Sequence, residues 1–176
     1  MQLFDEEAEH GKRGIYLSRN KELLCGFSLS RKQVLESVLR VPIDATIDRD
    51  SMTAKVFVPA IDTRMYLYNF SNLPYFRLFF QLGGVCDMLY VEEERCYTES
   101  HDVYAKGESD YCTDWLFTTG TTEAIEITLK YNQAEPPLVD EVALLLTVGL
   151  EFGKPGMDGN PIGVKYAGCG KIMKVG

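Results

Sequence analysis

The chain has two histidines, and they limit the catalytic chemistry that it could perform. A nucleophilic serine or cysteine needs a nearby base, most often a histidine. His10 lies in an acidic leader, whereas His101 is followed by Asp102 and shares a polar stretch with Cys112. His101 and Cys112 fit the roles of base and nucleophile, yet no Gly-x-Ser-x-Gly turn or other nucleophile signature accompanies them. A hydrolase that uses His101 and its acidic neighbours therefore ranks last among the functions that we weigh.

Carboxylates and thiols gather in the same part of the chain, but not at the spacing of a known site. Glycosidases need two carboxyls at a fixed separation, and calcium loops need regularly spaced oxygen ligands. Structural zinc sites take two ligands from one tight turn, which is absent here. With 26 acidic residues in the chain, a solvated loop is the simpler interpretation, and we expect neither a metal nor a cofactor. The residues considered are Cys86, Glu92, Glu93, Glu94, Cys96, Glu99, His101, Asp102, Glu108, Asp110, Cys112 and Asp114.

Gly168-Cys-Gly-Lys171 resembles the end of a phosphate-binding loop, but the rest of that motif is missing. Lys165 stands where the first glycine is required, and Ile172 stands where serine or threonine should follow the lysine. We therefore expect these glycines to relieve crowding in a strand or to form a β-bulge.

Aromatic side chains in and beside the polar stretch 96–110 form the favoured candidate site. Exposed tyrosine and tryptophan side chains anchor protein partners and stack on sugar rings. We select Tyr104, Tyr111 and Trp115 as the binding residues, with a role in the core or at a sheet edge as the alternative. The full set is Tyr97, Tyr104, Tyr111, Trp115 and Phe117.

Composition excludes several classes of partner. The chain has 176 residues, of which 45% are hydrophobic and 25% charged, as expected for one folded domain. The net charge is −8 and the pI about 4.8, so the surface repels nucleic-acid phosphates and anionic membranes. No apolar run reaches the roughly 20 residues of a membrane helix. We expect no nucleic acid and no membrane among its partners.

The N-terminus and the cysteines favour a cytoplasmic protein. Residues 1–12 are acidic and lack the basic and apolar regions of a secretory signal. The five cysteines are an odd number without a C-x-x-C pair, which indicates scattered reduced thiols. A Cys86–Cys96 or Cys96–Cys112 disulfide is the alternative for an exported protein.

The stretch 142–152 must be the central strand on which the other elements pack. Val142, Leu144, Leu146, Val148, Leu150 and Phe152 fall on one parity, and small or mixed residues, among them Gly149, fall on the other. Alternate side chains of a strand point to opposite faces, so one face is wholly apolar and covered. Gly149 lies where another backbone could approach.

Shorter runs with the same period predict further strands at 43–48, 54–58, 75–82 and 123–131. Gly83-Gly84 should bend the chain, and Asp158-Gly-Asn160 should form a hairpin turn. One helix is expected over residues 30–40, capped by Ser30 with Gln33 as its partner. Many strands without βαβ alternation indicate an antiparallel β-sandwich or barrel.

Several segments resemble an uncharacterised domain family of Bacteroidetes proteins that is labelled a domain of unknown function. The resemblance implies an immunoglobulin- or fibronectin-like sandwich and carries no known active site. We therefore expect an all-β, antiparallel, immunoglobulin-like β-sandwich with one short helix, in a single domain at 13–176 after a flexible leader at 1–12. The segments are Phe27-Ser-Leu-Ser, Glu36-Ser-Val-Leu-Arg-Val-Pro42, Pro74-Tyr-Phe-Arg-Leu78, Leu145–Gly153 and Val164–Lys171.

The favoured function is a non-enzymatic interaction or structural module. Sandwich domains commonly bind through their loops, and no catalytic cluster is present in the sequence. We expect a protein partner or self-association. A carbohydrate-binding module is the alternative, because the same aromatic side chains would stack on sugars.

Overall fold

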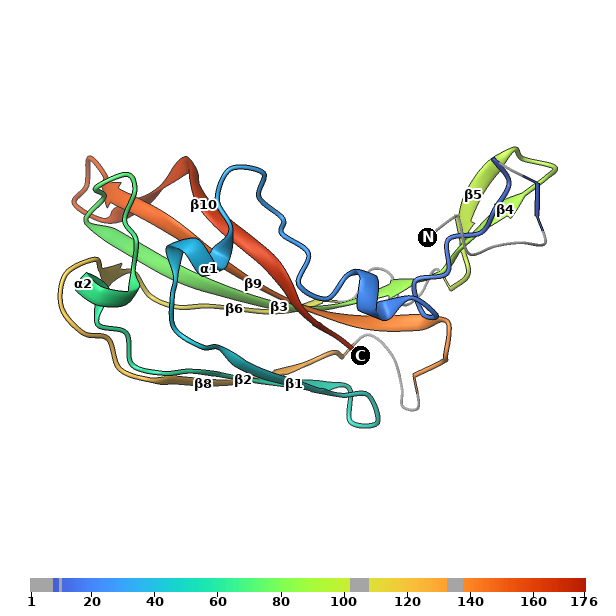
Figure 1. Ribbon diagram of the computed structural model, residues 1–176, viewed down its shortest axis with the longest axis horizontal. Helices are drawn as coiled ribbons and strands as arrows, with labels where there is room; N and C mark the ends of the chain where they lie inside the picture. Colours follow the sequence, from blue (N-terminus) through green and yellow to red (C-terminus); the bar gives the residue numbers. More distant parts are fainter. Residues whose placement is uncertain (1–7, 10, 102–107, 133–137) are drawn as a thin grey trace.

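The computed structural model describes residues 8–176, except 10, 102–107 and 133–137, and contains two antiparallel sheets that face each other (Figure 1). The larger sheet has the order β10-β9-β3-β6, with β7 also paired to β3, and the smaller sheet has the order β1-β2-β8. The predicted all-β antiparallel sandwich is confirmed, whereas its immunoglobulin-like type stays a prediction. The strands are β1 (Asp44–Asp48), β2 (Thr53–Val58), β3 (Tyr75–Cys86), β4 (Met88–Val91), β5 (Cys96–Glu99), β6 (Glu108–Cys112), β7 (Leu116–Phe117), β8 (Ile125–Lys130), β9 (Val142–Pro155) and β10 (Pro161–Val175).

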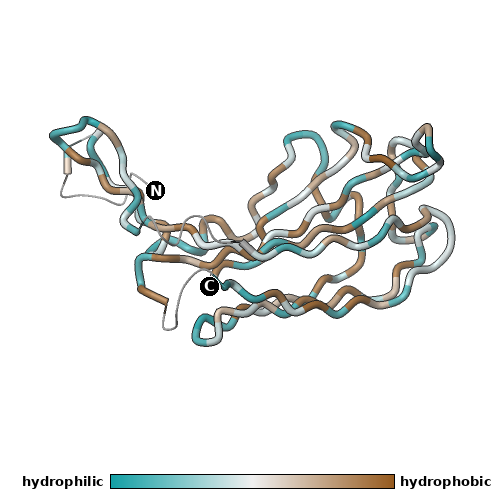
Figure 2. The backbone as a smooth tube through the Cα atoms, turned by 180° about the vertical axis from the view of Figure 1, so that it is seen from behind, coloured by the Kyte–Doolittle hydropathy of each residue, from teal (hydrophilic) through white to brown (hydrophobic). Residues whose placement is uncertain are grey.

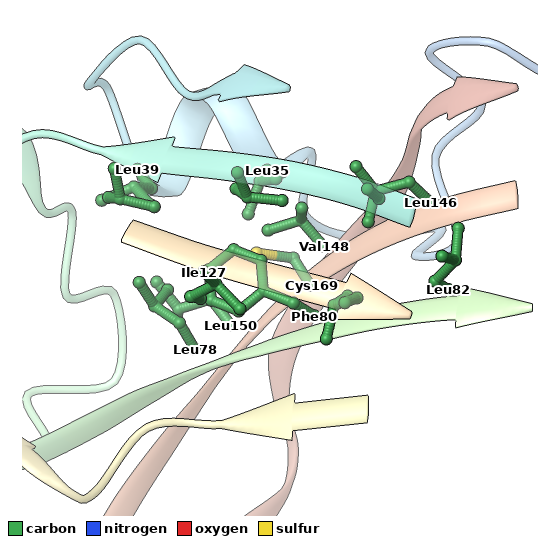
Figure 3. Close-up of a cluster of buried hydrophobic side chains, with 14 of the residues drawn as sticks. Leu35, Leu39, Leu78, Phe80, Leu82, Ile127, Leu146, Val148, Leu150 and Cys169 are labelled. Atoms are coloured by element: carbon green, nitrogen blue, oxygen red, sulfur yellow. The ribbon is translucent and has the colours of Figure 1, made fainter. Parts of the chain in front are cut away.

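β9 is the central strand of the core, as its alternation predicts. It pairs with β3 without a register shift, from Tyr75 opposite Gly153 to Cys86 opposite Val142. Figure 3 shows side chains of both strands beside Ile127 of the smaller sheet. Burial of the apolar face of β9 contributes on the order of 10 kcal/mol before conformational entropy is counted. Its buried side chains are Val142, Leu144, Leu146, Val148, Leu150 and Phe152.

The smaller sheet has one buried face and one charged face. Val56 pairs with Ala45 and with Ile127, and these side chains belong to the core. Alternate positions on the opposite face are mostly charged or hydroxylic, as expected for a sheet surface in contact with water. They are Asp44, Thr46, Asp48, Thr53, Lys55, Phe57, Glu126, Thr128 and Lys130.

The helix predicted at 30–40 is much shorter in the structure. Helix α1 spans Leu35–Val38, and Val34 before it is extended, with φ −85° and ψ 137°. Ser30 Oγ does accept the Gln33 N–H at 3.3 Å, but this contact closes a turn that does not continue as a helix. The prediction was therefore wrong for the helix and for its cap: α1 begins after Val34, without a side-chain cap.

Two further short helices lie in segments without helical periodicity. They are α2 (Thr63–Tyr66) and the 3-10 helix η2 (Lys21–Leu23). The Asp62 side chain caps α2 by accepting the Arg64 N–H at 3.1 Å. None of the helices in the described part of the chain has the length and apolar character needed to cross a membrane.

The bend predicted at Gly83-Gly84 is absent. β3 runs through both glycines, which pair with Leu145 and Leu144 of β9. Glycine permits a bend but does not impose one, and the long partner strand holds the register because a slip would expose its apolar face.

β4 and β5 form a hairpin that stands away from the sandwich, as Figures 1 and 2 show from opposite sides. Ile15 exchanges two backbone hydrogen bonds with Met88, of 2.8 and 3.0 Å. At the base of the hairpin, the buried Asp87 carboxylate accepts the Ser18 N–H at 2.8 Å and the Ser18 hydroxyl at 2.6 Å. The segment after the predicted leader therefore ties the hairpin to the sandwich; most of the leader itself lies outside the described residues.

Candidate binding groove on the outer face of the larger sheet

The face of the larger sheet that points away from the smaller sheet carries a row of aromatic side chains. In β3, Phe76, Leu78 and Phe80 are buried in the core, so Arg77 and Phe79 between them point outward. β7 adds Phe117, which pairs with Tyr75 and lies with its ring centroid 5.3 Å from the ring of Tyr75. The Phe117 side chain is 63% exposed. This row contrasts with the charged outer face of the smaller sheet.

Arg77 joins the row into a stack. Its guanidinium carbon lies 4.5 Å from the ring centroid of Trp115 and 4.9 Å from that of Phe79. Arg77 Nε and Nη2 both lie 2.9 Å from Glu151 Oε2 on the neighbouring strand. A guanidinium that stacks on rings and pairs with a carboxylate is held in one orientation, and so are the rings. The stack is therefore a preformed surface.

Glycines replace side chains over much of β9 and β10 on this face. Gly149 pairs with Gly170, Glu151 with Gly168 and Gly153 with Gly163. Paired residues share a face, and Gly149, Gly168 and Gly170 leave the backbone bare beside Phe79; these three glycines form the glycine floor of the groove. Gly153 and Gly163 lie beyond it, under the side chains of Trp115 and Glu151. As expected, Gly168 and Gly170 lie in a strand where a side chain would be crowded. A Cβ on Gly168 would lie 2.7 Å from the Leu150 carbonyl oxygen.

A bulge in β10 presents Tyr166 at one end of the floor. The register shifts between Gly163 and Gly168, so that residues 164–167 lie opposite Phe152 alone. Tyr166 has φ +67°, a conformation that bulky residues rarely adopt, and its side chain is 83% exposed. Bulges redirect side chains, and strained backbone is found mainly at functional sites. Tyr166 is thus an aromatic side chain held in solvent at a structural cost.

The segment 29–32 forms the other side of the groove. Leu29 donates its N–H to the Gly170 carbonyl at 2.8 Å, which seats the segment along the edge of β10. Leu29 to Lys32, the floor, Phe79, Gln81, Thr147 and Tyr166 enclose an open groove of about 570 Å³. A volume of this order lies within the range of known ligand sites.

Positive charge lies at the rim of the groove. Among the described residues, no ion pair involves Arg31, Lys32 or Lys165, whereas Lys171 is paired with Glu36. Lys165 Nζ lies 5.1 Å from the ring centroid of Tyr166. Among the described residues, these three cations thus have no carboxylate partner. Their positive charge should attract anions to the groove, although the chain as a whole has a net charge of −8.

The side chains of the groove offer little for covalent catalysis. Its residues within the described ranges include no carboxylate and no histidine, and Cys169 is the one thiol. Cys169 pairs with Leu150 and is buried on the core side, where burial, aided by Glu36, raises the pKa of its thiol to about 11. A buried thiol with that pKa is protonated at neutral pH and is a poor nucleophile. The described residues also contain no group of three or more His, Cys, Asp or Glu side chains placed to hold a metal ion.

Of the three predicted binding residues, the structure describes Tyr111 and Trp115 and places them on opposite sides of the larger sheet. Trp115 lies on the outer face, against Arg77 and Gly153. Tyr111 pairs with Phe80 and lies with its ring centroid 6.4 Å from that core ring, on the opposite side of the sheet. Tyr104 lies outside the described residues. Within the described residues, Trp115 therefore belongs to the outer face and Tyr111 to the edge of the sheet, and a site that unites all three residues stays a prediction.

The sequence reasoning missed Phe79 and Tyr166. In the predicted strand 75–82, Phe79 falls on the opposite parity to Phe76, Leu78 and Phe80, and an aromatic residue on the non-core parity is a usable signal. Tyr166 stands between glycines in a run that breaks the period of two, which is the pattern of a bulge. His101 and Cys112, the candidate base and nucleophile, lie at different places along β3. The His101 carbonyl accepts the Cys86 thiol at 3.3 Å, whereas the exposed Cys112 pairs with Phe79 and so shares the outer face beside the groove.

Comparison of the chain with protein-family models, with curated proteins and with solved structures finds no match.

Proposed function

We propose that this protein is a non-enzymatic binding module that acts through the outer face of the larger sheet. The contrast between the two outer faces carries the proposal. The smaller sheet presents Asp, Glu, Lys and Thr, as a solvated face does, whereas the larger sheet presents stacked rings and bare glycines. Contiguous apolar side chains on a surface mark interaction sites, and rigid aromatic anchors dominate the binding energy of such sites.

The side chains around the groove support the non-enzymatic part of the proposal. Among the described residues they supply aromatic, amide, hydroxyl and cationic groups, which bind and orient, but neither a carboxylate nor a histidine. The partner is a protein or a second copy of the chain. In either case, Trp115, Phe79 and Tyr166 act as anchors.

Site-specific photocrosslinking in cells of the source organism tests this proposal. The photoreactive residue p-benzoylphenylalanine replaces Tyr166 in one protein and Phe57 in a matched control. Phe57 is also an exposed aromatic residue, but it lies on the charged face of the smaller sheet. A discrete adduct is expected from the position of Tyr166 and not from that of Phe57. Equal adducts from both positions, or none from Tyr166, would contradict the proposal.

Carbohydrate binding is the second candidate, favoured by the rings of Phe79 and Tyr166 beside the groove. Sugar rings stack on such side chains, and a volume of about 570 Å³ accommodates a small oligosaccharide. An oligosaccharide array tests it: binding should occur and should be lost in Tyr166→Ala. A blank array with a folded protein counts against this candidate and leaves the first one intact.

A further inference from the structure

We propose that the groove takes an extended acidic peptide segment, with apolar side chains over the glycine floor and carboxylates at Arg31 and Lys32. This inference rests on the proposed binding role of the outer face and names the chemistry of the partner. Shape, hydrogen bonding and charge support it separately.

The shape of the groove suits an extended chain. Its floor is the backbone of β9 and β10 at Gly149 and Gly170, and no side chain stands on it. A Cβ on Gly149 would lie 3.5 Å from the Phe79 ring, and this ring therefore forms one wall of the groove. An open groove over bare backbone lets another backbone approach closely, which enclosed small-molecule sites do not require. A peptide strand can therefore lie in it and place apolar side chains against Phe79 and Leu29.

The hydrogen-bonding groups favour a peptide over a sugar. Sugar recognition needs many polar side chains that are available to hydroxyl groups. Ser30 Oγ already accepts the Gln33 N–H at 3.3 Å, and Thr147 Oγ1 contacts the Gln81 carbonyl at 3.5 Å. The groups without such partners among the described residues of the groove are the two cations and the rings. They match carboxylates and apolar side chains.

The charges set the sign of the ligand. Arg31 and Lys32 are exposed and follow each other at the rim, and no ion pair within the described ranges neutralises them. Lys165 lies beside Tyr166. The net charge of −8 means that most of the remaining surface repels an acidic segment. Electrostatic attraction should therefore guide such a segment to this groove.

Fluorescence anisotropy with two sets of labelled peptides tests the inference. In the first set Asp and Glu alternate with Leu and Tyr, and in the second Asn and Gln replace the acids. The acidic peptides should bind about tenfold more tightly than the amide peptides, because two partly exposed ion pairs are lost. Added salt should weaken the acidic set selectively.

Paired variants locate the effect. The double variant Arg31→Gln/Lys32→Gln should weaken the acidic peptides by about tenfold. Lys55→Gln/Lys130→Gln makes the same change in net charge on the outer face of the smaller sheet and should leave affinity within about twofold. Equal binding of both peptide sets, or equal losses in both double variants, would overturn the inference.

Three further outcomes separate this inference from the proposed function. Binding of an acidic oligosaccharide such as oligogalacturonate, without binding of the acidic peptides, would overturn the peptide assignment in favour of the carbohydrate candidate. A crosslinked adduct at the position of Tyr166 with no peptide binding would overturn only the assignment of the partner as an acidic peptide, and the proposed function would stand. The absence of both the adduct and peptide binding would overturn the inference and the proposed function together.

Discussion

Gly153 decides where the single tryptophan of the chain can lie. A Cβ at this position would come within 2.5 Å of the Trp115 ring, and the ring is also stacked on Arg77. Gly149, on the same face of the same strand, differs: a Cβ there would make ordinary contacts of 3.5 Å. The two glycines therefore have different roles, the first in holding the aromatic stack and the second in keeping the groove open.

This difference gives a prediction for two alanine substitutions. Gly153→Ala should destabilise the fold by about 1–3 kcal/mol, because the ring must leave its place. Gly149→Ala should be neutral or stabilise the fold by up to about 1 kcal/mol, because the unfolded chain loses freedom. Urea unfolding followed by tryptophan fluorescence measures both. Gly153→Ala should also change the native emission, whereas an unchanged spectrum and stability would show that Trp115 does not pack on Gly153.

At the scale of elements, the two faces of β9 have different roles: one stabilises the core, and the other belongs to the proposed binding surface. Leu146 is fully buried between the sheets, whereas Thr147 next to it lies on the outer face. Successive side chains of a strand point to opposite faces, so neighbours in sequence report on different surfaces. The same strand thus supplies the core and the floor of the groove.

Aspartate substitutions at these neighbours should have opposite outcomes. Leu146→Asp buries a carboxylate without a partner and should cost roughly 3–5 kcal/mol or more, a large part of the roughly 5–15 kcal/mol of a typical domain. Thr147→Asp should change the free energy of unfolding by no more than about 1 kcal/mol and should weaken acidic peptides. Circular dichroism and chemical denaturation compare them. A stable, soluble Leu146→Asp protein would show that the assigned core face is wrong.

At the scale of the whole molecule, the sandwich and the β4–β5 hairpin differ in how they are stabilised. The hydrophobic core joins the two sheets, and no residue of the hairpin from Met88 to Glu99 is buried. Two-stranded hairpins are only marginally stable without packing. The hairpin must depend on its attachments to the N-terminal segment at Ile15 and Ser18.

Hydrogen exchange should therefore divide the molecule into two parts. Amides of β4 and β5 should exchange by local opening, whereas central amides of β3 and β9 should exchange only through global unfolding. Asp87→Ala should speed exchange in residues 15–18 and in the hairpin, because it removes both Ser18 contacts, and should have a smaller effect on β9. Equal protection of the hairpin and the central strands would contradict this division.

Local patterns predicted most of the strands because the alternation of side chains is a property of the strand itself. The run at 142–152, the hairpin at 43–58 and the turn at Asp158-Gly-Asn160 all appear where the sequence places them. Predictions failed where contacts distant in sequence compete with local signals. The helix at 30–40 is interrupted at Val34, and the pairing of β3 with β9 overrides the bend expected at Gly83-Gly84.

The sequence by itself determined that this protein is an antiparallel all-β sandwich or barrel whose central strand has one fully apolar face, because the alternation of side chains along a strand does not depend on distant partners. Only the tertiary structure decided which aromatic side chains share a surface. Strand pairing places Tyr111 on the core side and Trp115 on the outer face, although they are near in sequence. It also brings the segment 29–32 beside Gly149 and Tyr166. The reason is that register and bulges, which depend on long-range pairing, set the face that each side chain occupies.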